Sequence, residues 1–142
     1  IHEEWVETRG DDYDQEVYER LLDSKNPRGY EYVKAMHMKP KLKAEIDACF
    51  NKIDIWVTPT LPILPTDIGQ REVEINGKRV NIRGALLKNT RPWNYTGHPA
   101  LSIPIGQSKT GLPIGMQLIG PYHQENLLFK IGNKLEQLVY QP

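Results

Sequence analysis

The stretch Leu101–Ile119, LSIPIGQSKTGLPIGMQLI, carries the clearest signal for the fold. From Leu101 to Ile105 every second residue is apolar, which is the pattern of a β-strand with one buried face. The residues Thr110–Pro113 (TGLP) are typical of a turn. The apolar run Ile114–Ile119 then predicts a further strand, in which Gly115 permits another backbone segment to approach closely.

The sequence on either side of this stretch supplies further elements. Ile53–Thr58 (IDIWVT) is short, β-branched and aromatic, which predicts a strand buried on both faces. The segment Arg71–Ile82 (REVEINGKRVNI) alternates around Asn76-Gly77, which supplies the two positive-φ positions of a type I′ turn, so we expect a surface β-hairpin. Glu125–Val139 has the apolar stripe of a closing helix. Helices and strands in this order predict an α/β or α+β fold.

Two helices are predicted before the first strand. Asp12 is expected to cap the first helix, and Asn26-Pro27 to end it and start the second. The second helix should run to about Asn51 and kink at Pro40. Its expected buried stripe consists of Tyr32, Ala35, Leu42, Ile46 and Cys49. The chain is therefore predicted to hold a helical pair over residues 1–52, and a sheet-forming part with a final helix over residues 53–142.

The composition excludes several classes of protein. Lys and Arg number 18 and Asp and Glu also number 18, so the net charge is +0, which argues against a binding partner made of nucleic acid. A single cysteine, Cys49, cannot form an internal disulfide, which favours a reducing compartment. No apolar run reaches the roughly 20 residues of a membrane span. We therefore predict a cytoplasmic protein that binds neither nucleic acid nor membrane.

Residue types and their spacing alone indicate no catalytic or metal-binding site. No serine has the flanking glycines of a nucleophile elbow, whether Ser24, Ser102 or Ser108. The 4 histidines have no short metal-ligand spacing, so no metal site and no cofactor are predicted. Cys49 lies on the apolar stripe of its helix, where a thiol usually packs as a small hydrophobe.

Three segments, taken in order, resemble the C-terminal part of the amidase signature hydrolases. They are DIWVTPTLP (Asp54–Pro62), NTRPWNYTGHPALSIPIG (Asn89–Gly106) and GLPIGMQLIGP (Gly111–Pro121). The resemblance implies an α/β fold with a mixed β-sheet flanked by helices, of which this chain, residues 1–142, is the C-terminal segment. It also implies an enzyme that cleaves carboxamide C–N bonds through a serine nucleophile, a bridging serine in a cis peptide, and a lysine base.

In the family those three catalytic residues lie upstream, in a Gly- and Ser-rich stretch and on a strand before it. This sequence contains no Gly-Gly and no Ser-Ser, so none of the three is assigned to a residue here. The expected partners are a missing N-terminal catalytic part of the same protein and a small amide substrate, with a homodimer left open. Two alternatives remain: a non-catalytic binding or scaffold module, and the A subunit of a tRNA-dependent amidotransferase.

The resemblance also points to residues that bind the substrate. A short helix is predicted over Gly84–Asn89, and if it continues toward Arg91, then Leu87 and Arg91 share one face, which the family turns toward the acyl side of the substrate. Gly84 would leave room there, and Trp93 would form a wall of the same cavity. The simpler alternative is that Leu87 packs in the core and Arg91 is a solvated charge. In amidotransferase A subunits an acidic residue that contacts the substrate amine occupies the position of Leu87, so the leucine favours apolar or aryl amides.

Overall fold

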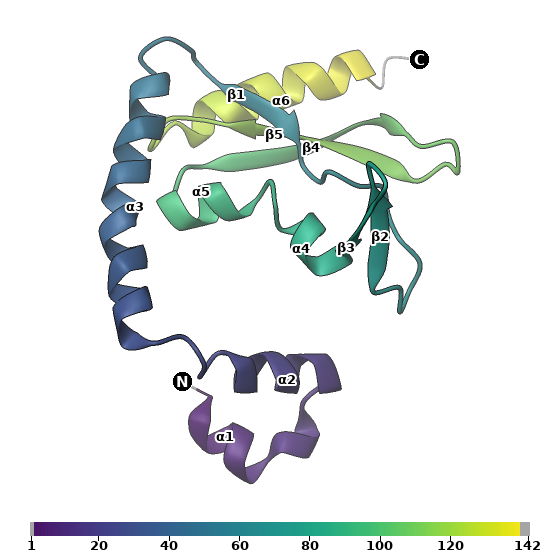
Figure 1. Cartoon of the computed structure of the whole chain (residues 1–142). Helices are drawn as coiled ribbons and strands as arrows, with labels where there is room; N and C mark the ends of the chain where they lie inside the picture. Colours follow the sequence, from purple (N-terminus) through teal and green to yellow (C-terminus); the bar gives the residue numbers. More distant parts are fainter. Residues whose placement is uncertain (1, 140–142) are drawn as a thin grey trace. The chain divides into compact units, whose positions relative to one another are not determined.

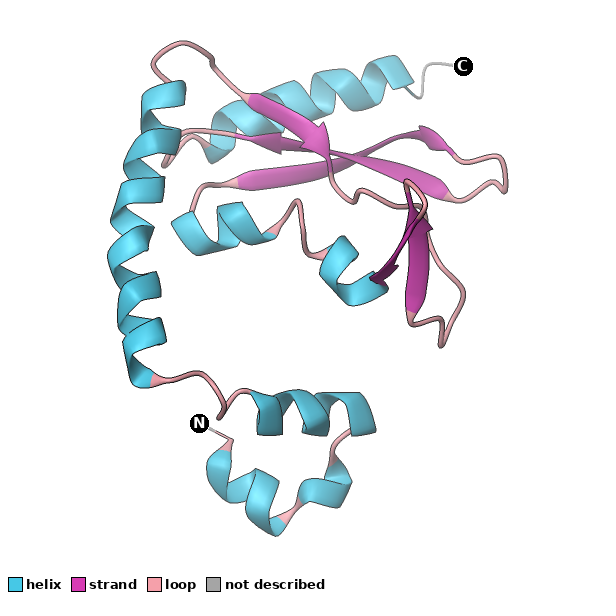
Figure 2. Cartoon of the chain, in the orientation of Figure 1, coloured by secondary structure: helices cyan, strands magenta, loops and turns pink. Residues whose placement is uncertain are grey.

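The computed structural model describes residues 2–139 of the chain. Its backbone contacts group into two compact units, Ile1–Met38 and Lys39–Pro142, which divide inside the long helix α3. Figure 1 shows the order of the elements along the chain, and Figure 2 separates helices from strands.

The first unit is helical. Its elements are α1 (Glu3–Thr8), the 3₁₀ helix η1 (Gly10–Asp12), α2 (Gln15–Asp23) and the beginning of α3 (Gly29–Cys49). Helix α2 is capped by Asp14, whose carboxylate accepts a hydrogen bond from the Glu16 amide at 3.0 Å. The prediction of Asp12 as the cap was wrong, because Asp12 belongs to η1 and pairs instead with Arg9 at 2.6 Å. The buried apolar side chain among the described residues of this unit is Val6.

Helix α3 is one continuous helix with Pro40 inside it. It begins at Gly29, two residues after the predicted start, and the Arg28 amide donates to the Glu31 carboxylate at 2.8 Å, as in a capping box. The predicted buried stripe holds only in the C-terminal half of the helix, where Ile46 is 7% exposed. Tyr32, in the N-terminal half, is 66% exposed, so its placement in the stripe was wrong.

The second unit is built on a three-stranded antiparallel sheet. Its strands, in spatial order, are β1 (Trp56–Pro59), β5 (Pro113–Ile119) and β4 (Ala100–Gln107). The strands β4 and β5 confirm the prediction from the quoted stretch, with a register shift between Pro104 and Gly106. A turn with Gly111 at φ +80° joins them.

Strand β1 differs from its prediction. It is shorter than the expected Ile53–Thr58, it pairs with β5 alone, and its residues alternate between half-buried and exposed. Val57 is 49% exposed, so among the described residues this strand is not buried on both faces. It lies at an edge of the three-stranded sheet, although the sequence pattern indicated a central strand.

Helices cover the two faces of this sheet, and each face has its own core. On one face α6 (Glu125–Val139), whose bounds match the prediction, packs Leu128 against Ile103 and Leu118. Gly132 of α6 allows the close approach, because a Cβ there would lie 2.6 Å from Leu101 Cδ2. Figure 1 shows α6 and α5 on opposite sides of the sheet.

The other face is covered by α5 (Arg91–Thr96) and the C-terminal half of α3. There Ile46 and Trp93 pack against Ile119, which is 0% exposed. Helix α5 was not predicted as an element of its own. Gly97 ends it with φ +84°, the left-handed conformation that glycine adopts without strain.

A two-stranded hairpin and a short helix complete the unit. The strands β2 (Glu72–Ile75) and β3 (Lys78–Asn81) pair around Asn76 and Gly77, whose φ angles of 52° and 74° confirm the predicted turn. Helix α4 (Ile82–Leu86) follows directly. The Asn81 side chain caps α4 by accepting a hydrogen bond from the Gly84 amide at 3.2 Å.

Candidate functional site

The predicted substrate-binding residues lie on α4, on α5 and on the loop between them. The condition attached to their prediction, one helix continuing from Gly84 to Arg91, is not met: α4 ends at Leu86 and α5 begins at Arg91. Leu87 is half-buried at the end of α4, and Arg91 is exposed. A Cβ on Gly84 would meet nothing within 4 Å, so there is open space beside it.

Trp93 lies in the hydrophobic core rather than on the surface. It is 8% exposed, packs with Ile46 and Ile119, and meets Trp56 edge-on with ring centroids 5.5 Å apart. Its indole Nε1 is buried without a hydrogen-bond partner among the described residues. Its role as a wall of the substrate cavity stays a prediction.

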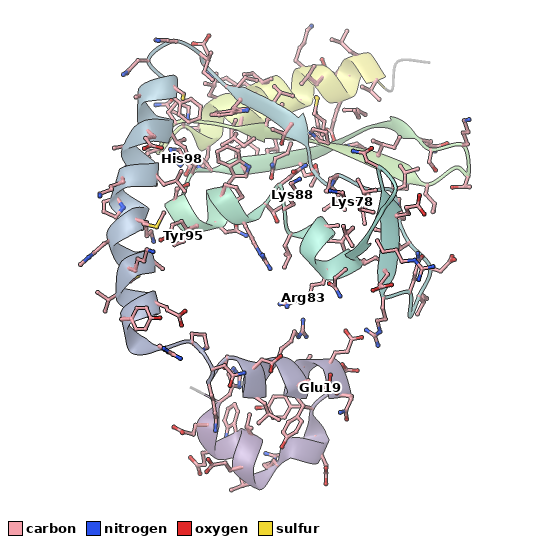
Figure 3. All side chains as sticks on the ribbon, in the orientation of Figure 1. Glu19, Lys78, Arg83, Lys88, Tyr95 and His98 are labelled. Carbon is pink, nitrogen blue, oxygen red and sulfur yellow. The ribbon has the colours of Figure 1, made fainter. Side chains whose placement is uncertain are left out.

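Backbone hydrogen bonds connect the loop that carries Leu87 to the helices on either side of it. The Leu87 amide donates to the Arg83 carbonyl at 3.1 Å, and the Leu87 carbonyl accepts from the Arg91 amide at 3.0 Å. The Thr90 hydroxyl also donates to the Leu87 carbonyl, at 3.4 Å. These bonds fix the backbone of Leu87 relative to both flanking helices, even though no single helix joins it to Arg91. Figure 3 labels Lys88, which lies on this loop.

Two amide side chains connect the same loop to the sheet. Asn89 Nδ2 donates to the Pro59 carbonyl at 2.9 Å, at the end of β1. Gln117 Nε2, from the middle of β5, donates to Thr58 Oγ1 at 3.1 Å and to the Asn89 carbonyl at 3.1 Å. Gln117 is 4% exposed, so these bonds satisfy a buried amide. We call this pair of side chains, Asn89 and Gln117, the amide tie.

A groove begins where β1 ends. It has a volume of about 410 Å³ and is lined by the proline-rich segment 59–65, by Ser102 and by residues 113–115. The hydroxyls of Thr60 and Ser102 lie 2.7 Å apart there. Gly115 makes room for them, because a Cβ at this position would lie 2.9 Å from Thr60 Oγ1, so the atoms that approach this glycine closely belong to side chains and not, as expected, to another backbone segment. A threonine hydroxyl is no general base, so the hydrogen bond of Ser102 to Thr60 does not activate Ser102 as a nucleophile.

A second polar cluster joins α3 to the start of β4. His98 is buried, and its Nε2 donates to Asp47 Oδ1 at 3.1 Å while its Nδ1 lies 2.8 Å from Thr96 Oγ1. Lys43 donates to Asp47 Oδ2 at 2.9 Å, and its ammonium lies 3.8 Å from the ring centroid of Tyr122. Figure 3 shows His98 beside α3.

The same cluster shifts two pKa values. The hydrogen bond from Lys43, with a further one from His98, lowers the pKa of the Asp47 carboxyl. The hydrogen bond to Asp47 raises the pKa of the Lys43 ammonium. His98 and Asp47 are 51 residues apart, so no local pattern in the sequence joined them. The cluster therefore connects the C-terminal half of α3 to the segment that precedes β4.

The stability that Asp47 contributes should depend on pH in a defined window. A carboxyl with a lowered folded-state pKa stabilises the fold above its ordinary value of 3.8, and this contribution is lost as the pH falls through the folded-state pKa. The unfolding free energy of the unsubstituted protein should therefore exceed that of Asp47→Asn at neutral pH, and the difference should shrink below pH 3.8. Denaturant titrations at several pH values would measure it. Glu45→Gln, an exposed position on the same helix, is the control, and an equal pH dependence in both variants would contradict the assignment.

The described residues offer little support for other kinds of site. Within residues 2–139 no group of three or more His, Cys, Asp or Glu side chains is arranged to hold a metal ion. None of the helices that the structure describes has the length and apolar character needed to span a lipid bilayer. Sequence reasoning missed Asn89, Gln117, Asp47 and His98, because each acts through a partner distant in the sequence.

Comparison with known proteins identifies the family. A family model described as Amidase matches residues 6–129. The A subunit of the glutamyl-tRNA(Gln) amidotransferase of Archaeoglobus fulgidus is 36% identical over 104 residues, which are 73% of this chain and 21% of that protein. The fatty acid amide hydrolase of Oryza sativa subsp. japonica is 30% identical over 111 residues, which are 78% of this chain and 18% of that protein.

The fold agrees with the sequence match. A solved structure described as the crystal structure of amidase superposes with a TM-score of 0.89 at 25% sequence identity, over 97% of this chain and 32% of that chain. The chain thus spans about a fifth of the length of these curated relatives and about a third of the solved amidase. The predicted fold class and the resemblance on which it rested are confirmed. The chain belongs to the amidase signature family.

Proposed function

We propose that this chain is the C-terminal segment of an enzyme that hydrolyses carboxamides to a carboxylate and ammonia. The observation that carries the proposal is the family match over residues 6–129 together with the superposition on a solved amidase. The serine, the bridging cis-serine and the lysine of the family mechanism then lie outside these 142 residues, in an N-terminal part of the same protein. Residues 1–142 form part of a single domain with that missing part, and the protein works in the cytoplasm.

In this proposal the segment contributes to substrate binding and not to bond cleavage. Leu87, Arg91 and the open space at Gly84 face the acyl part of the amide, and Trp93 forms a wall of the same cavity. An apolar side chain at position 87 cannot pair with an amino-acid ammonium, whereas a carboxylate could. The substrates we propose are therefore small linear amides with apolar or aryl acyl groups.

A second candidate is the A subunit of a tRNA-dependent amidotransferase. It is favoured by the 36% identity to the Archaeoglobus fulgidus protein. Leu87 argues against it, because an apolar side chain cannot pair with the ammonium group of glutamine. The two candidates separate by substrate: the protein that contains this segment should release ammonia from benzamide or propionamide, and the amidotransferase would release it from glutamine.

The isolated 142-residue chain should not hydrolyse amides. Among residues 2–139 the hydroxyls of Thr60 and Ser102 bond each other and no base, and acyl transfer without nucleophile, base and oxyanion hole retains only residual catalysis. Ammonia release from benzamide and propionamide would be measured for the isolated chain and for the native protein, whose intact mass shows whether an N-terminal part is present. Hydrolysis by the isolated chain that Ser102→Ala abolishes would overturn the proposal that catalysis lies elsewhere. A native mass equal to that of these 142 residues would instead support a non-catalytic module.

A further inference from the structure

Gln117 is a buried polar residue on β5, where its cross-strand neighbours are Thr58 of β1 and Ser102 of β4. Its two successors on β5, Leu118 and Ile119, are both 0% exposed, and Gln117 itself is 4% exposed. A buried amide without hydrogen bonds is strongly unfavourable, so a glutamine at such a position needs fixed partners. The hydrogen-bond partners of the Gln117 side chain lie outside its own strand, β5.

The partners of Gln117 lie on β1 and on the loop between α4 and α5. The amide nitrogen of Gln117 donates to Thr58 Oγ1 and to the Asn89 carbonyl, each at 3.1 Å. The Asn89 side chain continues the connection, because its Nδ2 donates to the Pro59 carbonyl at 2.9 Å. The amide tie therefore joins two strands and one loop through three hydrogen bonds.

This connection reaches the loop close to Leu87. The chain between α4 and α5 belongs to neither helix, yet the Leu87 backbone is bonded to Arg83 on one side and to Arg91 on the other. Besides the packing of α5 on the sheet through Trp93, the loop is attached to the sheet directly by Asn89, two residues after Leu87. The position of the Leu87 side chain relative to the sheet therefore depends on how firmly this loop is attached to the sheet.

We propose that the amide tie is a positioning device that holds Leu87 against the acyl group of the substrate and so sets the enzyme's preference for amide size. This inference rests on the proposed function. Neither Asn89 nor Gln117 is proposed to touch the substrate; both act through the loop. Without the tie the loop loses its direct hydrogen bonds to the sheet, so KM rises for amides whose acyl group reaches Leu87. We expect kcat, and the KM for small amides, to stay unchanged.

The test uses the complete enzyme and two variants of the tie. Asn89→Asp keeps the shape of the side chain and removes the donor to the Pro59 carbonyl, at a half-buried position that tolerates a charge better than the core. Gln117→Met removes both donations from the core without leaving a cavity. Asn126→Asp, the same chemical change at an exposed position on α6, is the matched control.

The readout is kcat/KM for benzamide divided by kcat/KM for propionamide. Loss of one or two hydrogen bonds corresponds to a factor of about 5 to 30, so we expect this ratio to fall by about that factor in both tie variants, through KM, and to stay unchanged in Asn126→Asp. In a Leu87→Ala background, Asn89→Asp should lower the ratio no further, because the tie acts through the side chain that has been removed.

Each outcome decides between distinct explanations. An unchanged ratio with a lowered melting temperature would mean that the tie only supports the fold, and an additive loss in the Leu87→Ala background would mean that it acts elsewhere; both overturn the inference. A wild-type enzyme that hydrolyses neither amide would overturn the proposed function itself. Asn89→Asp is the milder change, so a fold lost in Gln117→Met still leaves the ratio measurable.

Discussion

Replacing Leu118 with alanine should lower the free energy of unfolding by about 2 to 5 kcal/mol, the range for a leucine removed from a packed core. Leu118 is 0% exposed and lies on β5, the central strand of the sheet. Its side chain packs against Ile103 of β4 and Leu128 of α6, so the cavity would open between three elements. Chemical denaturation of the complete protein, followed by circular dichroism, would measure the loss.

The matched control for this substitution is Leu112→Ala. Leu112 is 45% exposed in the turn between β4 and β5, so the same deletion of atoms removes little buried surface there. We expect a change within about 0.5 kcal/mol for it, as for most surface substitutions. Equal losses at positions 112 and 118 would show that the core assigned to this face of the sheet is incorrect.

Replacing Leu87 with tryptophan should reduce the size of acyl group that the complete enzyme accepts. A filled apolar pocket discriminates between ligands by about 1 to 3 kcal/mol, which corresponds to roughly 10- to 200-fold in kcat/KM. The enzyme should therefore show a raised KM for benzamide and nearly unchanged kinetics for acetamide. Steady-state ammonia release with both substrates would measure the effect.

Two comparisons make this second prediction specific. Gly84→Ala adds one methyl group into open space, so it should affect the bulky amide less than Leu87→Trp does. Equal losses for large and small amides in Leu87→Trp would mean that Leu87 supports the fold. The assignment of this loop to the substrate site would then have to be abandoned.

Local patterns in the sequence predicted those elements whose partners are close along the chain. The Asn76-Gly77 turn and helix α6 depend on neighbours within a few residues, and the strands β4 and β5 pair with each other across a short turn. Helix α5 was not predicted, although Pro92 lies in its first turn, where proline is favoured. The Thr-x-Pro pattern at residues 90–92 was the signal that could have separated it from α4.

The predictions that depend on distant partners were less accurate. The apolar composition of Ile53–Thr58 indicated burial on both faces, but burial is decided by what packs against a strand, and β1 pairs only with β5 among the described residues. The three hydrogen bonds of the amide tie span separations of 28, 30 and 59 residues along the chain, and such contacts leave no trace in spacing or periodicity. The sequence therefore singled out Leu87 as a candidate, but not the loop on which it lies or the side chains that attach this loop to the sheet.

The long connection between β1 and β5 has a consequence for how the chain tolerates changes in length. Thr58 and Gln117 bond across 59 residues, and the β2–β3 hairpin lies within that connection. The entropy of closing a loop grows only with the logarithm of its length, so even doubling a flexible connection costs about 0.6 kcal/mol more. A Cβ at Gly77, in the hairpin turn, would meet nothing within 4 Å. Insertions at this turn should therefore leave the pairing of β1 with β5 nearly unaffected.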